Sequence, residues 1–99
     1  MYVIFATDTF KEIYSSLDKT EKDWIDTIKK KLEEIPTGRP LGYRWFLEKK
    51  FLNKRLFFLV DEERKKLLFV SFASKKEEQA IIDFVKDNMK ELLEHPHNL

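Results

Sequence analysis

The chain has 99 residues, which suffice for one domain with a single modest core and are too few for two independent cores. It contains no cysteine, so disulfides, thiolate metal sites and a cysteine nucleophile are excluded, and a domain this small without disulfides is expected in the cytoplasm. The net charge of +1 conceals an uneven layout: residues 39–76 carry eleven Lys or Arg against four Asp or Glu, and both flanking segments are acidic.

The first third of the chain predicts one strand followed by two helices. Residues 2–6 form an apolar run typical of a strand, without the basic lead of a signal peptide, and no segment approaches the roughly 20 apolar residues of a membrane span. Thr7 or Asp8 can cap a short amphipathic helix over residues 9–17. Thr20, with Asp23 three residues on, predicts the start of a second helix that ends at Pro36 and Gly38. The apolar stripe of this second helix comprises Trp24, Ile25, Ile28, Leu32 and Ile35.

The remaining chain predicts three strands and one helix. Residues 36–42 hold both glycines and two of the three prolines, so we expect a loop there. Extended periodicity then covers residues 43–51, 54–61 and 66–73, and Leu52-Asn53 fits a tight hairpin turn because Asn tolerates positive φ. Helical spacing returns over residues 75–93, and residues 95–99 are expected to be a flexible tail. The order β-α-α-β-β-β-α predicts a single α+β domain with an antiparallel meander.

The hairpin turn assigns side chains to the two faces of the predicted sheet. If Leu52-Asn53 is a two-residue turn, Lys50 lies opposite Arg55, and Lys75 and Lys76 follow the last strand near the same end. One face is nearly all apolar and is predicted to be the core: Trp45, Leu47, Leu56, Phe58 and Val60. The other face mixes aromatic and charged side chains: Arg44, Phe46, Glu48, Lys50, Arg55, Phe57 and Leu59.

The mixed face is compatible with RNA binding. Arg and Lys can hold phosphates and stabilise charge that develops on phosphorus, and aromatic rings can stack on exposed bases. Spacing alone favours a simpler interpretation, in which Glu48, Lys50 and Arg55 form a cross-strand ion cluster. No Gly-rich phosphate loop is present, and His95 and His97 are expected to belong to a surface tail rather than a metal site. We therefore expect neither a metal nor a cofactor.

Three segments in order resemble the RelE/ParE toxin superfamily, most closely its archaeal RelE-like members. They are Pro40-Leu41-Gly42 with Phe46 to Lys50, then Lys54 to Val60 with an arginine early in the middle strand, then Leu67 to Gln79 with lysines after the last strand. The likeness covers about residues 2–93. The resemblance implies the RelE-like fold and reverses the preference for a simple ion cluster.

The resemblance also implies a metal-independent endoribonuclease that cuts mRNA, including mRNA on the ribosome, by 2′-hydroxyl attack, inhibits translation and is neutralised by an antitoxin. Arg55 matches the family's strand arginine, and Lys76, or else Lys75, occupies the basic position after the last strand. Glu48 is a general base or, in the favoured interpretation, orients Arg55. The RNA-binding residues are then predicted as follows: Arg44, Lys49, Lys50, Phe46 and Phe57.

Two departures leave alternatives open. The helix after the last strand reads Gln79-Ala80-Ile81-Ile82, without the aromatic residue or His that several members carry there, and lysine replaces arginine at the preceding basic position. The first alternative is therefore a catalytically inactive protein of the toxin fold that binds RNA or an antitoxin. The second is a ParE-like inhibitor of DNA gyrase. An antitoxin is expected to cover the basic face or the sheet edge.

Overall fold

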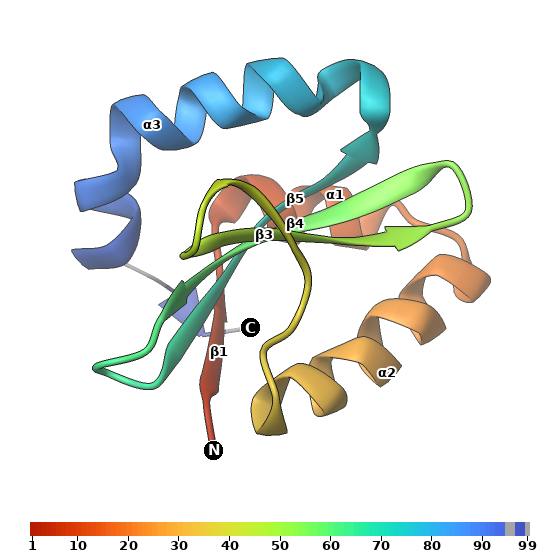
Figure 1. Cartoon of the computed structure of the whole chain (residues 1–99). Helices are drawn as coiled ribbons and strands as arrows, with labels where there is room; N and C mark the ends of the chain where they lie inside the picture. Colours follow the sequence, from red (N-terminus) through yellow and green to blue (C-terminus); the bar gives the residue numbers. More distant parts are fainter. Residues whose placement is uncertain (95–96, 99) are drawn as a thin grey trace.

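The protein forms one mixed sheet with helices on both faces in the computed structural model, which describes residues 1–94 and the backbone of residues 97–98 (Figure 1). The strand order in the sheet is β2-β3-β4-β5-β1-β6. The meander from β2 to β5 is antiparallel, β1 lies parallel to β5, and β6 pairs antiparallel with β1. The strands are β1 (Val3–Ala6), β2 (Arg39–Tyr43), β3 (Phe46–Phe51), β4 (Lys54–Asp61), β5 (Lys66–Ser74) and β6 (His97–Asn98).

Helices cover both faces of this sheet. Helices α1 (Asp8–Ser15) and α2 (Lys19–Glu34) pack on one face, whereas α3 (Glu78–Glu94) runs over the other after the 3₁₀ turn η1 (Lys75–Glu77) (Figure 1). The predicted α+β class and the pairing of the three long strands are confirmed. In the predicted tail, residues 97–98 form β6, and the remainder of residues 95–99 lies outside the described residues.

The caps of the first two helices are side chains that accept backbone hydrogen bonds. The hydroxyl of Thr7 accepts from the Phe10 N–H at 3.0 Å, as predicted for the start of α1. Asp18 Oδ1 accepts from the Glu21 N–H at 2.8 Å, and Glu21 in turn accepts from the Asp18 N–H at 3.3 Å. The predicted start of α2 at Thr20 is therefore wrong, because Asp18 already caps the helix.

The predicted loop over residues 36–42 is wrong in its second half, where the chain forms the edge strand β2. Arg39 lies opposite Glu48 and Pro40 opposite Leu47. An edge strand tolerates Pro40, since a proline there removes no hydrogen bond from the sheet interior. The pairing becomes irregular before Tyr43, and Gly42 takes a φ of 89° that favours glycine. The following strand consequently begins at Phe46 rather than at Tyr43.

The protein has two cores, one on each face of the sheet. The face under α1 and α2 contains the predicted core residues Leu47, Leu56 and Phe58. The opposite face, predicted to be mixed, is buried as well, because α3 covers it. Both β4 and β5 are therefore central strands buried on both sides, which agrees with their nearly continuous apolar sequence. The second core consists of Leu41, Phe46, Phe57, Leu59, Leu68, Val70, Ala73 and Val85.

Candidate nucleic-acid interface

The β3–β4 hairpin brings cations to one end of the sheet. Phe51 pairs with Lys54 across a two-residue turn, so Lys50 lies opposite Arg55 as predicted. The positive φ of 55° falls on Leu52 rather than on Asn53. Arg55 also lies opposite Ala73 near the end of β5, after which η1 begins with Lys75 and Lys76. We call the cations Arg39, Lys50, Arg55, Lys75 and Lys76 the basic cluster.

A buried carboxylate lies at the centre of this cluster. The Glu48 side chain is only 4% exposed, and its Oε1 accepts a hydrogen bond of 2.7 Å from Arg39 Nε. Arg55 Nε lies 3.3 Å from the same oxygen. A buried carboxylate requires such positive partners, because an unpaired charge inside a protein is strongly destabilising. Glu48 therefore holds two guanidinium groups beside each other.

The guanidinium of Arg55 is held in place mainly by electrostatic attraction to the Glu48 carboxylate. Its side chain is 13% exposed, and its buried Nε makes no well-directed hydrogen bond despite the short distance to Glu48. Neither terminal nitrogen of its guanidinium has a partner among the described residues. The planar fork of Arg55 is therefore free to hold two oxygens of a phosphate.

The prediction missed Arg39, which also belongs to this cluster. Its Nε contacts Glu48, and its Nη2 donates a 2.9 Å hydrogen bond to Glu78 Oε1 at the start of α3. The hydrogen bond with Glu48, followed by the nearby negative charge, raises the pKa of Arg39 above its ordinary value. Gly38 lets the chain before Arg39 pass close to β3, because a Cβ on residue 38 would lie 2.7 Å from the Glu48 carbonyl oxygen. Arg39 escaped prediction because the Pro- and Gly-rich segment around it indicated a loop.

Three lysines complete the cluster on its solvent side. Lys50, Lys75 and Lys76 are exposed, and within the described part of the chain none of them makes an ion pair or a side-chain hydrogen bond. Unpaired cations at a surface attract phosphates over a distance of about one Debye length, roughly 8 to 10 Å at moderate salt. Lys50 lies opposite Arg55, and Lys75 and Lys76 follow the strand end beside it, so these lysines add positive charge near Arg55.

The two phenylalanines predicted to stack on bases lie elsewhere. Phe46 and Phe57 are fully buried in the second core, beneath α3. A ring without exposed surface cannot stack on a nucleobase, so this part of the prediction is wrong. The error follows from assigning the whole face to solvent, although a helix covers most of it.

Lys49 lies on the opposite face of the sheet from Lys50. Its Nζ donates a 3.0 Å hydrogen bond to the Thr37 hydroxyl, at the end of the connection between α2 and β2. Side chains alternate along a strand, so neighbouring lysines of β3 must point to different faces. The structure does not bring Lys49 into the basic cluster.

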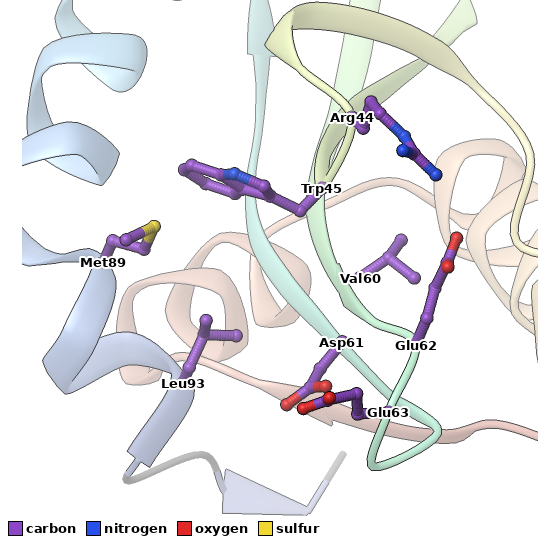
Figure 2. Close-up of a pocket in the computed structure, with 8 residues that line it drawn as sticks. All are labelled: Arg44, Trp45, Val60, Asp61, Glu62, Glu63, Met89 and Leu93. Atoms are coloured by element: carbon purple, nitrogen blue, oxygen red, sulfur yellow. The ribbon is translucent and has the colours of Figure 1, made fainter.

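Arg44 lies at the other end of the sheet, in the turn between β2 and β3. It lines a cavity of about 480 Å³ together with residues of the β4–β5 turn and α3. Trp45 extends toward Met89 and Leu93, whereas Arg44 points across the hairpin toward Glu62 (Figure 2). Arg44 therefore lies at the opposite end of β3 from Lys50 and Arg55.

Two further properties concern the described residues only. None of their helices combines the length and apolar character needed to cross a membrane. Over the same residues, no three or more His, Cys, Asp or Glu side chains lie close enough together to bind a metal ion.

Comparison with known proteins gives matches among solved structures alone. No family model and no curated protein sequence matches the chain. The isolated RelE toxin of E. coli superposes with a TM-score of 0.68 at 14% identity, over 85% of this chain and 99% of that one. A chain of the archaeal RelE-RelB complex from Pyrococcus horikoshii gives 0.66 at 14% identity, over 75% and 94%.

A third solved structure agrees with these two. A chain of the RelBE2 toxin-antitoxin complex of Mycobacterium tuberculosis gives a TM-score of 0.61 at 16% identity, over 75% of this chain and 98% of that one. The arrangement of strands and helices is thus shared across nearly the full length of each of these proteins. The chain has the fold of RelE toxins, as the sequence resemblance predicted.

Proposed function

We propose that the protein is the toxin of a toxin-antitoxin pair, and that it binds RNA at the basic cluster and cleaves it. One observation carries this proposal: on a RelE-like fold, the end of the β3–β4 hairpin presents the free guanidinium fork of Arg55 among unpaired lysines. Such a site suits a polyanion whose phosphates lie at the surface. The target we propose is mRNA in the cytoplasm, including mRNA held on the ribosome.

The chemistry we propose is transfer at phosphorus without a metal. The 2′-oxygen of the RNA forms a bond to the adjacent phosphorus, and the bond from that phosphorus to the 5′-oxygen breaks. Negative charge builds on the phosphate oxygens during attack, and Arg55 stabilises it through two parallel hydrogen bonds. Lys76, or Lys75, serves as the second cation and donates a proton to the departing 5′-oxygen, while water takes up the proton that the 2′-hydroxyl loses on attack.

The geometry supports Glu48 as a positioning residue rather than a general base. Its Oε1 already contacts two arginines, and its Oε2 is buried without a hydrogen-bond partner. A general base has to come within about 3 Å of the proton that it removes. A 2′-hydroxyl bound at the surface lysines would have to enter the sheet to reach this carboxylate.

The partner we propose is an antitoxin that neutralises the basic cluster. The E. coli, P. horikoshii and M. tuberculosis structures include toxin-antitoxin complexes. An open positive surface would otherwise bind cellular RNA indiscriminately. Affinity for the antitoxin is therefore expected to fall as the salt concentration rises. An affinity that does not change with salt would contradict an electrostatic interface.

Single-turnover cleavage of RNA by purified protein, with and without ribosomes, tests the proposal. The Arg55→Ala variant should cut about 10²- to 10³-fold more slowly, the range expected when one stabilising donor is removed. Arg55→Lys should recover part of the rate, because lysine lacks the bidentate fork. The matched control is Arg64→Ala, which removes an exposed arginine paired with Asp61 in the β4–β5 turn and should leave the rate unchanged.

The outcomes separate the candidate functions. Equal rates for the parent and Arg55→Ala would show that the site is assigned wrongly. RNA binding by a parent that never cuts RNA would identify a binding module of the same fold. Circular dichroism of each variant verifies that a lost rate does not reflect a lost fold.

A further inference from the structure

We propose that Arg39 forms a second phosphate-binding position beside Arg55, and that Glu78 occupies this position while no nucleic acid is bound. The proposed ligand is a backbone phosphate of single-stranded RNA, which replaces the Glu78 carboxylate on Arg39. This inference rests on the proposed RNA-binding function and extends its site to the edge strand β2.

The guanidinium of Arg39 is arranged for two different partners. Its Nε is fixed on the buried Glu48, whereas its Nη2 faces the surface and bonds Glu78 Oε1 at 2.9 Å. The Arg39 side chain is 61% exposed. The inner contact therefore orients the arginine, and the outer contact leaves its terminal nitrogens accessible to an incoming anion.

A shared oxygen places Arg39 next to Arg55. Both Nε atoms lie within 3.3 Å of Glu48 Oε1, so the two guanidinium groups are neighbours although they come from strands β2 and β4. A nucleic acid held by Arg55 would consequently pass close to Arg39. Because Glu48 is buried and contacts both arginines, it cannot leave without exposing the interior of the sheet.

Glu78 is the carboxylate that can be exchanged. It contacts Arg39 alone among the described cations, and its side chain is 18% exposed at the first residue of α3. Ion pairs with a solvent-exposed partner contribute little to stability, whereas arginine binds phosphate through strong charge-assisted hydrogen bonds. A Glu78 side chain released from Arg39 would still be favoured by the positive end of the α3 dipole.

The exchange changes the charge of the site. The two arginines and the carboxylates of Glu48 and Glu78 together have no net charge. When Glu78 moves away, the same arginines present one unbalanced positive charge to the RNA, next to the unpaired lysines. Glu78 thereby lowers the positive charge of the site while no RNA is bound.

A double-mutant cycle on RNA binding tests the exchange. The probe is a single-stranded oligonucleotide carrying 2′-O-methyl groups, which cannot be cut by 2′-hydroxyl attack, and the readout is its fluorescence anisotropy. Glu78→Gln should tighten binding about two- to fivefold, since an ion pair of this kind must otherwise be broken. Arg39→Ala should weaken binding and reduce the slope of log affinity against log salt by about 0.7, the value for one phosphate contact on a single strand.

Glu77→Gln is the matched control, because it removes the same charge from an exposed neighbour that has no ion pair among the described residues. The inference requires that Glu78→Gln tightens binding more than Glu77→Gln does, and that this difference disappears in the Arg39→Ala background. Equal effects of the two substitutions, or a gain that persists without Arg39, would overturn it.

NMR of the parent protein tests the inference without any substitution that could impair folding. In the parent protein, the Nε–H resonance of Arg39 should stay near its position when the oligonucleotide is added, whereas the Nη resonances shift as phosphate replaces carboxylate. Unchanged Nη resonances at saturation would overturn the second phosphate position while the RNA-binding function stands. A parent that binds no oligonucleotide would overturn both.

Discussion

Both faces of the β3–β4 hairpin carry lysines, but only the lysines of one face have partners among the residues that the structure describes. On the face covered by α1 and α2, both hairpin lysines have partners within the fold: Lys49 bonds Thr37, and Lys54 pairs with Glu21 at 2.6 Å. On the face covered by α3, Lys50 is exposed and has no ion pair within the described ranges 1–94 and 97–98. The same residue type thus serves the fold on one face and is left open on the other.

This difference teaches where a small protein of this kind can place a site. Two helices close one face of the sheet, whereas a single helix crosses the other and leaves the hairpin end open to solvent (Figure 1). Apolar side chains under the helices hold the strands, and charged side chains beyond the helix are available for a ligand. The surface that we propose binds RNA is therefore the uncovered end of a face whose remainder is core.

The largest expected effect concerns neighbouring phenylalanines on opposite faces. Phe57 and Phe58 are both fully buried, each in a different core. Phe57→Ala and Phe58→Ala should each lower the free energy of unfolding by about 3–5 kcal/mol, as expected for a deleted buried ring. Urea denaturation followed by circular dichroism measures the loss. A Phe57→Ala protein of parental stability that has lost RNA binding would restore Phe57 as a base-stacking residue.

The sequence contained a signal for the second core. Residues Leu56 to Val60 are apolar without interruption, and such runs indicate a strand buried on both faces rather than a half-exposed one. Alternation identified one face correctly because Leu47, Leu56 and Phe58 are indeed core. On the opposite face the prediction from alternation was wrong, because it did not consider that α3 covers the sheet there.

The hairpin register was predictable, whereas the partners of its charges were not. A two-residue turn fixes which residues lie opposite each other, and this local rule placed Lys50 beside Arg55. Arg39 and Glu78 join the cluster from an edge strand with an irregular pairing and from a helix start 39 residues apart in the chain. Such contacts depend on the tertiary fold and leave no periodic pattern in the sequence.

The second effect concerns Glu48, the buried carboxylate that separates the open site from the core. Glu48→Gln should lower the free energy of unfolding by about 1–3 kcal/mol, because two arginines lose their charged partner near the interior. RNA cleavage should fall as Arg55 loses its fixed orientation, with the pH profile of the remaining rate unchanged in shape. A profile that loses its acidic limb would instead identify Glu48 as a general base.

A smaller effect distinguishes the two adjacent lysines of β3. Lys50→Ala should weaken binding of single-stranded RNA several-fold and reduce the slope of log affinity against log salt by about 0.7, the value for one phosphate contact. Lys49→Ala, which removes the same charge from the other face, should leave that slope unchanged. If both substitutions reduce the slope by the same amount, RNA extends around the edge of the sheet to the α1–α2 face.

The smallest expected effect is at Arg44, although this residue is as cationic as Arg55. Lys50 follows Arg44 by six positions, through the β2–β3 turn and along β3, which corresponds to at most about 20 Å at the rise of an extended strand. A separation approaching 20 Å is about twice the Debye length at 0.1 M salt, so the charge of Arg44 is largely screened at Lys50 and Arg55. Its side chain also points toward Glu62 rather than along the sheet (Figure 2).

Arg44→Ala should therefore leave the RNA dissociation constant at 0.1 M salt within about twofold of the parent, while Arg55→Ala in the same assay weakens binding clearly. Anisotropy titrations repeated at 0.02 M salt sharpen the test, because the Debye length then exceeds 20 Å and a purely electrostatic contribution of Arg44 becomes measurable. Loss of affinity at both salt concentrations would mean that RNA contacts the β2–β3 turn directly. The binding surface would then run the full length of β3, and the two ends of the sheet would no longer differ in function.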